Sequence, residues 1–326
     1  MSSDQPKCFA EPTIRLGVSM CLLGEEVRYD GGHKLDRFLV NTLGGFVEWV
    51  PVCPEVEIGL STPRESLRLV GDPEAPRLMA PKSGRAYTET MQTWARERLE
   101  QLAVIKLHGF VFKRDSPSSG LFRVRVYDQH GMPRRVGTGI FPREVMGRLP
   151  LLPLEEEGRL HDMRLRENFI ERIFVYYRWR CLLEENPAPG GLVQFHTAHK
   201  LTLMAHSPSH YQEIGRLVAQ AGSLPWTEVV ETYGGLLMEG LKVLSTPGRH
   251  ANVLQHLMGF LKDVLSREDK AELLGLIEDY RKGLVPLIVP LTLLKHHLRR
   301  HPVPDWVHQQ VYLNPYPKEL MLRNHV

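Results

Sequence analysis

Two cysteines and a serine-rich loop are the residues of this chain best suited to chemistry. Cys21 lies in SMCLLG, Cys53 lies in VPVCPEVEIGL, and a Ser-Pro-Ser-Ser-Gly segment occupies residues 116–120. Thiols are soft ligands that suit metals such as iron in clusters. Prolines stiffen the loop around Cys53, and Gly120 permits a tight turn in the serine-rich loop. The three segments therefore suit a soft-metal pocket. The alternative is that both cysteines are buried structural residues, because free cysteine is among the most buried residue types.

Each of the three segments follows a predicted strand. The runs IRLGVSM at 14–20, VEWVPV at 47–52 and GFVFKRD at 109–115 are short and apolar or rich in β-formers, and an amphipathic helix is expected at 88–107. This alternation predicts an α/β domain with a mainly parallel, Rossmann-like sheet. Open parallel sheets bind ligands at the carboxyl ends of their strands. We therefore expect both cysteines and the serine-rich loop to share that edge.

The pattern becomes helical from about residue 164. Apolar residues recur at spacings of three and four, which predicts an all-α domain. Ser266 with Asp269 resembles an acidic capping box, and Gly283 is suited to end a helix. The segment 149–160 is the expected joint, so we place one domain at 1–157 and a second at 158–326. The expected helical segments of the second domain are 166–185, 192–206, 210–222, 226–244, 251–265 and 270–283.

Composition sets limits on the class of protein. The chain has 326 residues, which favours two domains over one. Its formal net charge of +3 is too balanced to prove a nucleic-acid partner, although the basic excess lies in the second half. Its 4 cysteines are too scattered for a disulfide framework, so reduced thiols are expected. No signal peptide or membrane span is evident. These features predict a cytoplasmic protein that does not enter a membrane.

Segments of both halves resemble known families. The first half resembles the thiouracil desulfidase family, often called TudS-like, through SMCLLGEEVRYDGGHK, VPVCPEVEIGLSTPRE, FVFKRDSPSSG and VGTGIF. The second half resembles the YbgA-type helical family through HKLTLMAHSPSHYQEIG, HANVLQHLMGF, DYRKGLVPLIVPLTLLKHH and LMLRN. Together the resemblances extend from about residue 14 to the end of the chain. The fused pair is similar to desulfidases that remove sulfur from 4-thiouridine in transfer RNA.

The resemblance implies a 4Fe-4S cluster held by three cysteines, with one iron left open. By position the ligands fall on Cys21, Cys53 and Ser119, although the family commonly has cysteine at the last place. A serine hydroxyl must lose a much less acidic proton than a thiol before it can bind iron. Four alternatives stay open: Ser119 binds as an alkoxide, Cys8 or Cys181 replaces it, the serine is an engineered change, or the cluster is absent.

The mechanism that the resemblance favours is a non-redox hydrolysis. A cluster with an open iron would supply a Lewis acid for the thiocarbonyl sulfur, which would leave as sulfide while water adds to the ring. Glu55, two residues beyond Cys53, is the candidate to activate water or to protonate the ring nitrogen. Ser116 is the candidate to hydrogen-bond the leaving sulfur or the uracil edge. The structural alternatives are a helix-terminal carboxylate for Glu55 and an ordinary turn residue for Ser116.

Basic residues in both halves are candidates for contact with substrate phosphates. A solvated surface is the alternative for the residues of both halves, and Arg64, Lys113 and Arg114 could instead neutralise the negative cluster and its bound sulfide. The histidine pairs 196/199 and 297/301 either join a basic RNA-binding face or bind a second metal, but no carboxylate or cysteine accompanies either pair at ligand spacing. The first-half candidates are Arg28, His33, Lys34, Arg64, Lys113 and Arg114, and the second-half candidates are Lys200, Lys295, Arg299 and Arg300.

Three functions are consistent with these residues, and the oligomeric state is left open. The first is removal of sulfur from 4-thiouridine in transfer RNA, with release of sulfide. The second is removal of sulfur from free 4-thiouracil or 4-thiouridine monophosphate, which would need no RNA-binding face. The third is a cluster-less protein that binds nucleotides or RNA, which Ser119 favours and the retained CPE and SPS segments disfavour. The long second domain favours transfer RNA over the free nucleotide.

Overall fold

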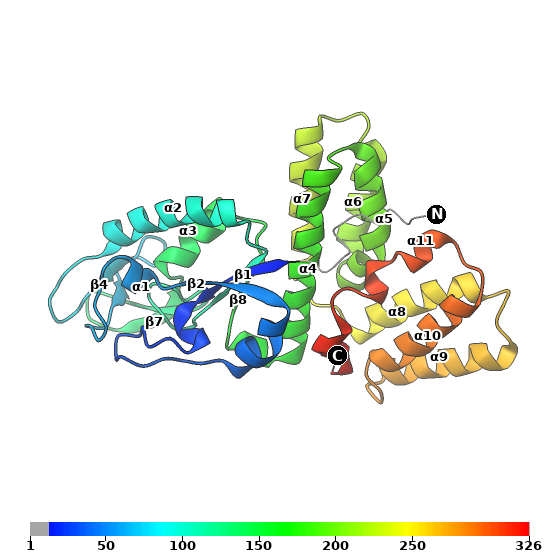
Figure 1. Cartoon of the computed structure of the whole chain (residues 1–326), viewed down its shortest axis with the longest axis horizontal. Helices are drawn as coiled ribbons and strands as arrows, with labels where there is room; N and C mark the ends of the chain where they lie inside the picture. The colour runs from blue at the N-terminus through cyan, green and yellow to red at the C-terminus, as the bar shows by residue number, and fades with distance from the viewer. Residues whose placement is uncertain (1–12, 326) are drawn as a thin grey trace. The chain divides into compact units, whose positions relative to one another are not determined.

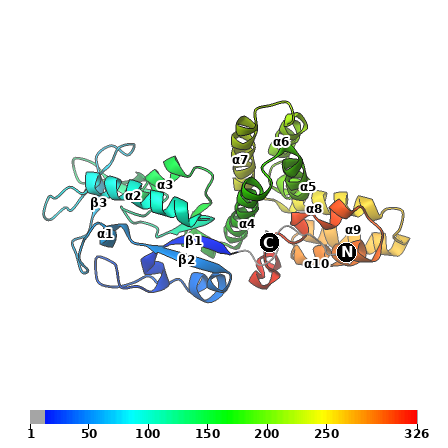
Figure 2. The same ribbon diagram turned by 45° about the horizontal axis from the view of Figure 1, so that its top comes forward.

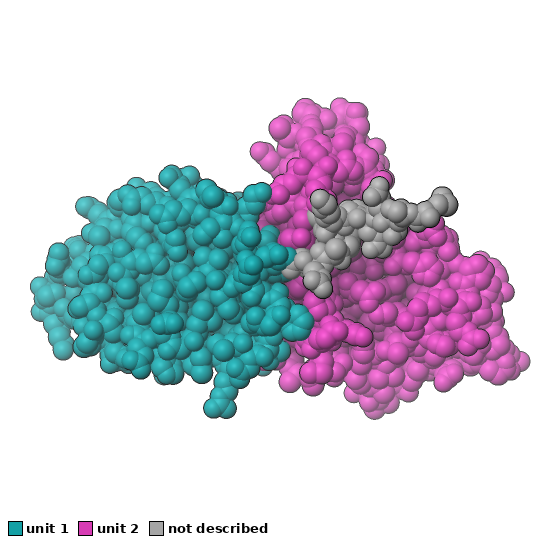
Figure 3. Space-filling model, in the orientation of Figure 1, with its two compact units in different colours: residues 1–161 teal, residues 162–326 magenta. Residues whose placement is uncertain are grey.

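The chain folds into two compact units that divide between His161 and Asp162 (Figure 3). The computed structural model describes residues 13–325. The joint expected at 149–160 ends just before the division. No helix in the described part of the chain combines the length and the apolar character that a membrane crossing requires.

A four-stranded sheet with the order β2-β1-β5-β8 forms the centre of the first unit, and every neighbouring pair is parallel. This confirms the predicted α/β fold. Ser19 lies opposite Val52, and Val18 lies opposite Val111, so three strands end nearly level with one another. The loops that carry the thiols and the serines therefore leave from one edge, as expected. The strands are β1 (Ile14–Ser19), β2 (Val47–Val52), β5 (Gly109–Phe112) and β8 (Leu154–Glu156).

Helices α2 (Thr88–Ile105) and α3 (Ile140–Arg148) lie side by side over this sheet (Figure 1). Trp94 of α2 and Phe110 of β5 both pack against Phe141 of α3, with ring centroids 5.1 and 5.6 Å from it. Phe110 and Phe141 are fully buried. This aromatic cluster fixes the strand that leads into the serine-rich loop.

A second sheet, which the sequence did not predict, completes the first unit. Its order is β4-β3-β6-β7, with β3 and β6 parallel and the two outer pairs antiparallel. One face packs into a small core that includes Leu69, Leu78 and Val126. Its strands are β3 (Arg68–Val70), β4 (Arg77–Met79), β6 (Val124–Tyr127) and β7 (Pro133–Gly137).

Short helices and turns connect these strands. The segment after β1 contains a 3-10 helix at Met20–Leu23, a π-helical turn at Phe38–Thr42 and a second 3-10 turn at Leu43–Gly45. Helix α1 (Pro54–Glu57) follows β2 directly, and a 3-10 turn at Arg159–His161 ends the unit.

The second unit is helical, as predicted (Figure 2). Ser266 accepts a hydrogen bond from the Asp269 amide at 3.0 Å, and Gly283 follows α9 with a φ of 77°, so both expected helix signals are confirmed. Helix α10 was not among the segments expected from periodicity. The helices are α4 (Met163–Glu185), α5 (Pro189–His206), α6 (Pro208–Gln220), α7 (Trp226–Lys242), α8 (Pro247–Met258), α9 (Arg267–Arg281), α10 (Ile288–Arg300) and α11 (Asp305–His308), with 3-10 turns at Gly259–Leu261, Val311–Leu313, Lys318–Leu320 and Leu322–Asn324.

A buried network of charged side chains joins α4 to α5 and to the end of the chain. Glu171 contacts His206 at 2.7 Å, and Arg323 lies 3.3 Å from Glu167 and 3.8 Å from Glu171. Tyr316 donates a hydrogen bond to Glu167 at 2.7 Å. Removing one member would leave an uncompensated charge in the core, which is costly. The network therefore ties the last residues of the chain to the first helix of the unit.

Candidate active site

A cavity of about 440 Å³ lies at the carboxyl edge of the parallel sheet. Cys21 reaches it from the 3-10 helix after β1, and Cys53 reaches it from the position before α1. The serine-rich loop supplies Ser116 and Ser119 to the same lining. The structure thus brings together the three segments that the sequence singled out.

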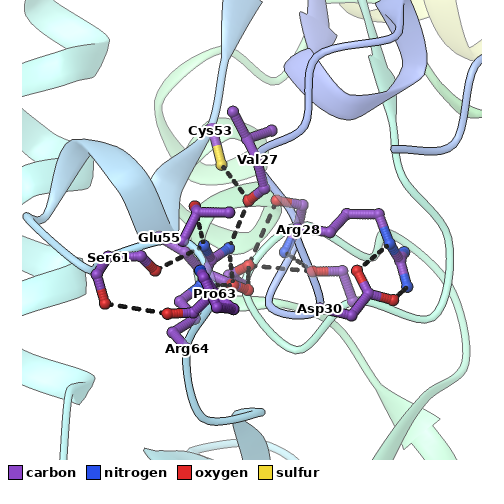
Figure 4. Close-up of polar contacts among 12 residues, drawn as sticks. Val27, Arg28, Asp30, Cys53, Glu55, Ser61, Pro63 and Arg64 are labelled. Atoms are coloured by element: carbon purple, nitrogen blue, oxygen red, sulfur yellow. Dashed lines mark hydrogen bonds and ion pairs between the residues drawn. The ribbon is translucent and has the colours of Figure 1, made fainter. Parts of the chain in front are cut away.

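Both thiols are held in surroundings that favour the protonated form. Burial raises the pKa of Cys21 to about 11, and the nearby ammonium of Lys113 opposes this rise only in part. Burial also raises the pKa of Cys53. The Cys53 thiol donates to the carbonyl oxygen of Val27 at 4.0 Å (Figure 4). Binding of a metal here would have to release both thiol protons.

The serine-rich loop folds back on itself. The Ser116 hydroxyl accepts a hydrogen bond from the Ser119 amide at 3.1 Å and lies 3.0 Å from the Ser118 hydroxyl. Gly120 donates its amide to the Ser116 carbonyl at 2.7 Å. A Cβ at Gly120 would lie 2.7 Å from that same carbonyl oxygen, so the turn requires glycine. Ser119 is buried at the cavity wall.

The start of α3 holds this loop in place. The Phe141 amide donates to the Ser118 carbonyl at 3.0 Å, and the Gly139 amide donates to the Gly120 carbonyl at 2.7 Å. A Cβ at Gly139 would lie 2.9 Å from the Ser118 carbonyl group. The VGTGIF segment is therefore the surface against which the serine-rich loop docks.

Glu55 is fixed at both carboxylate oxygens. The Ser118 hydroxyl donates to Oε1 at 2.7 Å, and Arg64 donates to Oε2 through Nε at 2.8 Å and through Nη2 at 2.5 Å. Arg64 also donates to the Val27 carbonyl at 2.8 Å, so its guanidinium bridges two walls of the cavity (Figure 4). The sequence offered Arg64 as a phosphate contact, as a positive charge near a cluster and its sulfide, or as an exposed residue, but its side chain is only 6% exposed and pairs with Glu55.

Glu57, rather than Glu55, bonds the backbone at the start of α1. Its Oε1 accepts a hydrogen bond from the Cys53 amide at 3.1 Å, and its Oε2 lies 3.1 Å from Nε of Arg98. Glu55 therefore does not bond the start of the helix. It lines the cavity, whereas Glu57 does not. Sequence reasoning missed this division of roles, although the contact of Glu57 with Cys53 is local, and it missed Ser118, whose contact with Glu55 joins distant segments.

Besides Arg64, four of the predicted basic residues of the first unit line the cavity: Arg28, Lys34, Lys113 and Arg114. Glu157, one residue beyond β8, contacts the Lys113 ammonium at 2.5 Å and accepts the Arg114 amide at 2.8 Å. His33 lies outside the lining, is exposed, and accepts a hydrogen bond from the Leu35 amide at 3.2 Å.

The predicted basic residues of the second unit are partly engaged. The Lys200 ammonium lies 3.7 Å from the ring centroid of Trp306, and Lys295 donates to the Asn314 side chain at 2.6 Å. Arg299 and Arg300 are exposed at the end of α10. The geometry leaves these two side chains the most accessible of the four.

The histidines near Lys200 belong to the core. His199 is 1% exposed, bonds the Phe195 carbonyl at 2.8 Å, and has its pKa lowered to about 3 by burial. His196 is 9% exposed, lies 3.4 Å from the Tyr233 hydroxyl, and has its pKa lowered to about 4, also by burial. Both side chains stay neutral near pH 7. The expectation that they join a basic face is wrong.

The alternative metal ligands do not gather into a site. Among residues 13–325 no group of three or more histidine, cysteine, aspartate or glutamate side chains is arranged to hold a metal ion. Cys181 is half-buried on α4 of the second unit. Cys8 lies outside the described residues.

The two units of the chain match different families of known proteins. Residues 16–157 match the family model described as 2-thiouracil desulfurase, and residues 200–317 match a family described as protein of unknown function (DUF1722). The chain is 32% identical over 108 residues to the uncharacterized protein YbbK of Bacillus subtilis, which covers 32% of this chain and 71% of YbbK.

Two further relatives were found. The chain is 29% identical over 164 residues to the uncharacterized protein YbgA of Escherichia coli, which covers 49% of this chain and 95% of YbgA. A solved structure described as the 4Fe-4S-dependent thiouracil desulfidase TudS is 27% identical, covers 48% of this chain and 98% of that chain, and superposes with a TM-score of 0.38.

Proposed function

We propose that this chain, which belongs to the 2-thiouracil desulfurase family through its first unit and to the YbgA-type family through its second, removes sulfur from 4-thiouridine in transfer RNA and releases sulfide. The family assignment supports an enzyme that removes sulfur from a thiouracil-type substrate. Transfer RNA as the substrate and an iron–sulfur cluster as the cofactor are the finer parts of the proposal.

The observation that carries the proposal is the convergence of two thiols, a fixed carboxylate and several cations on one cavity. Cys21, Cys53 and Glu55 come from two different loops, and Lys113 comes from a third. Soft ligands beside an acid–base group suit the cleavage of a carbon–sulfur bond, because sulfide is a soft leaving group.

The donor set fits a 4Fe-4S cluster at two of three corners. Cys21 and Cys53 offer thiols, whereas Ser119 offers a buried hydroxyl, a harder donor that loses its proton less readily. These three residues would hold the cluster. A bound cluster supplies a Lewis-acidic iron for the sulfur of the substrate.

The side chains of the cavity take the remaining roles. Glu55, held by Arg64 and Ser118, is placed to position and deprotonate a water molecule or to exchange a proton with the ring nitrogen. Ser116 lines the same wall and is the group proposed to hydrogen-bond the uracil edge or the leaving sulfur. Lys113 supplies positive charge near Cys21. Its contact with Glu157 keeps that charge in a fixed position.

The second unit is proposed to bind the RNA backbone through Lys200, Lys295, Arg299 and Arg300. Contacts of this kind position a nucleic acid without reading its sequence. A free thiouracil nucleotide is the alternative substrate, since the cavity by itself could hold one. The third possible function is the binding of nucleotides or RNA without a cluster.

Anaerobic reconstitution separates these functions. The protein is loaded with iron and sulfide and then incubated with thiolated transfer RNA or with 4-thiouridine monophosphate. The proposal expects broad visible absorption that is lost in Cys53→Ala and kept in Cys181→Ala, together with sulfide release from the RNA. Release from the nucleotide alone would identify the free-nucleotide enzyme. Equal absorption in both variants would exclude Cys53 as a ligand.

A further inference from the structure

The second sheet of the first unit is unusually rich in arginine. Its four strands read RLV, RLM, VRVY and PRRVG, and they contain five arginines and no acidic residue. The chain as a whole is nearly balanced, with 41 basic and 38 acidic residues. The excess of arginine is therefore specific to this sheet and does not follow from the composition of the whole chain.

Strand register places four of these arginines on one face. Leu69 lies opposite both Leu78 and Val126, and these three point into the core. Because side chains alternate along a strand, the flanking residues point to the other face. Arg125 lies opposite Arg135 on the next strand. The arginines of this outer face are Arg68, Arg77, Arg125 and Arg135, and all four are exposed.

Two of the four reach the active-site cavity. Arg68 and Arg125 occupy the positions just before the paired residues Leu69 and Val126 on neighbouring parallel strands, and both line the cavity. Tyr127 lines it as well, and the Arg68 guanidinium lies 4.6 Å from the centroid of its ring. An arginine stacked on a tyrosine, with a second arginine beside it, forms a wall of the cavity.

These two arginines differ from most of the other cations of the cavity, which are paired with carboxylates. Arg28 pairs with Asp30, Arg64 with Glu55, and Lys113 with Glu157. Within residues 13–325, by contrast, neither Arg68 nor Arg125 has an ion pair with a carboxylate. Their charge is therefore available to an anion from outside the protein.

We propose that the outer face of the sheet β4-β3-β6-β7 binds the RNA phosphates next to the thiouridine. Arg68 and Arg125 lie at the mouth of the cavity, and the ring of Tyr127 stacks against a nucleotide of the RNA strand. This inference rests on the proposed function for the identity of the anion. Guanidinium groups bind phosphate oxygens in pairs, and aromatic faces beside them hold unstacked nucleotides. The desulfidase unit thereby grips its substrate strand itself, in addition to any contact made by the helical unit.

The test measures binding of a transfer RNA that contains 4-thiouridine to the metal-free full chain by fluorescence anisotropy at several salt concentrations. No turnover is needed, so the result does not depend on the cluster. In Arg68→Gln/Arg125→Gln we expect the affinity to fall by about tenfold or more and the salt slope to shrink by about 1.5, because two phosphate contacts are lost. Arg96→Gln is the matched control, since Arg96 is exposed on α2 and does not line the cavity.

A double lysine variant, Arg68→Lys/Arg125→Lys, guards against a folding defect. It keeps the two charges, so it should retain most of the salt slope while losing the paired contacts that guanidinium makes. The inference is overturned if Arg68→Gln/Arg125→Gln binds the transfer RNA with the same affinity and the same salt dependence as the parent protein. Loss of binding in that variant, together with a parent enzyme that releases no sulfide, would instead uphold the RNA face and reject the proposed reaction.

Discussion

Ser119 differs from a cysteine by a single atom, and under the proposed function that atom sets how well the cavity would hold iron. We predict that Ser119→Cys raises iron occupancy and slows its removal by a chelator, because a thiolate replaces a hydroxyl at the third corner. The site is already buried between Ser118 and Gly120, so the variant changes the donor and little else. Visible absorption per protein and chelation rate measure the effect.

The control for this variant is Cys181→Ser, which makes the reverse exchange on α4 of the second unit. It should leave both quantities unchanged. If Ser119→Cys gains no iron while Cys53→Ala loses it, another group already fills the third corner.

Glu55 provides the second prediction at this scale. Glu55→Gln should keep the iron and lose at least about a hundredfold in sulfide release, because the amide keeps the shape and cannot transfer a proton. Glu48→Gln, at an exposed position on β2, is the control and should match the parent. Parent turnover in Glu55→Gln would reduce Glu55 to an anchor for Arg64.

At the scale of elements, the contact between the serine-rich loop and α3 determines the shape of the cavity wall. Gly139→Ala places a Cβ 2.9 Å from the Ser118 carbonyl, so either the loop moves or the helix start moves. We predict a loss of about 1 to 3 kcal/mol in the free energy of unfolding and weaker iron absorption. Denaturant titration of the iron-free chain and absorption of the loaded chain measure the two effects.

Gly147→Ala is the matched control, because Gly147 lies within α3, which Gly139 precedes as the N-cap residue, and no atom lies within 4 Å of its added Cβ. It should be neutral, or stabilising by up to about 1 kcal/mol through better helix propensity. Equal unfolding curves for the two variants would mean that the loop does not depend on this contact.

The sequence predicted the elements with strong local patterns and missed those defined by distant partners. Strands β1, β2 and β5 are short runs that are apolar or rich in β-formers and are bounded by turns, so their common edge followed from the rule for parallel sheets. The strands of the second sheet are only three to five residues long, and each contains at least one arginine, which resembles the sequence of a loop.

Side-chain partners were the least predictable part of the site. Ser118 and Glu55 are 63 residues apart in sequence, and nothing local marks their hydrogen bond. His196 and His199 lie on α5, which is buried on several sides, so helical spacing could not show which face meets solvent. The thiols were found because cysteine is rare in this chain and each follows a strand.

At the scale of the whole molecule, the buried histidines make stability depend on pH. The pKa values of His196, His199 and His250 are lowered to about 4, 3 and 3, with burial as the main cause. In the unfolded chain they take up protons near pH 6.5. As the pH falls from 6.5 toward 3, the unfolded state therefore binds more protons, and the folded state loses stability by up to about 1.4 kcal/mol per pH unit for each histidine.

Glu171 adds to this loss at lower pH. Its pKa is lowered to about 2, despite its burial, by the hydrogen bond and the charge of His206 and by Arg323, so its contribution is present above pH 4.5 and disappears as the pH falls toward 2. We predict that the second unit unfolds before the first as the pH falls from 7 to 4. Urea unfolding, together with hydrogen exchange of the amides in each unit, measures this order. In His250→Gln the free energy of unfolding should depend less steeply on pH than in the control His256→Gln, in which the substituted histidine is exposed. An unchanged slope would contradict the assignment.

The position of Glu157 at the end of the first unit has a consequence for synthesis on the ribosome. The chain emerges from its N-terminus, so both thiols and the serine-rich loop are made before the carboxylate that holds Lys113 and the Arg114 amide. β8, which completes the parallel sheet beside β5, also arrives late. Since domains fold as units during translation, the nascent chain presents its proposed metal ligands in an unfinished enclosure, and the enclosure closes only after β8 and Glu157 have left the ribosome.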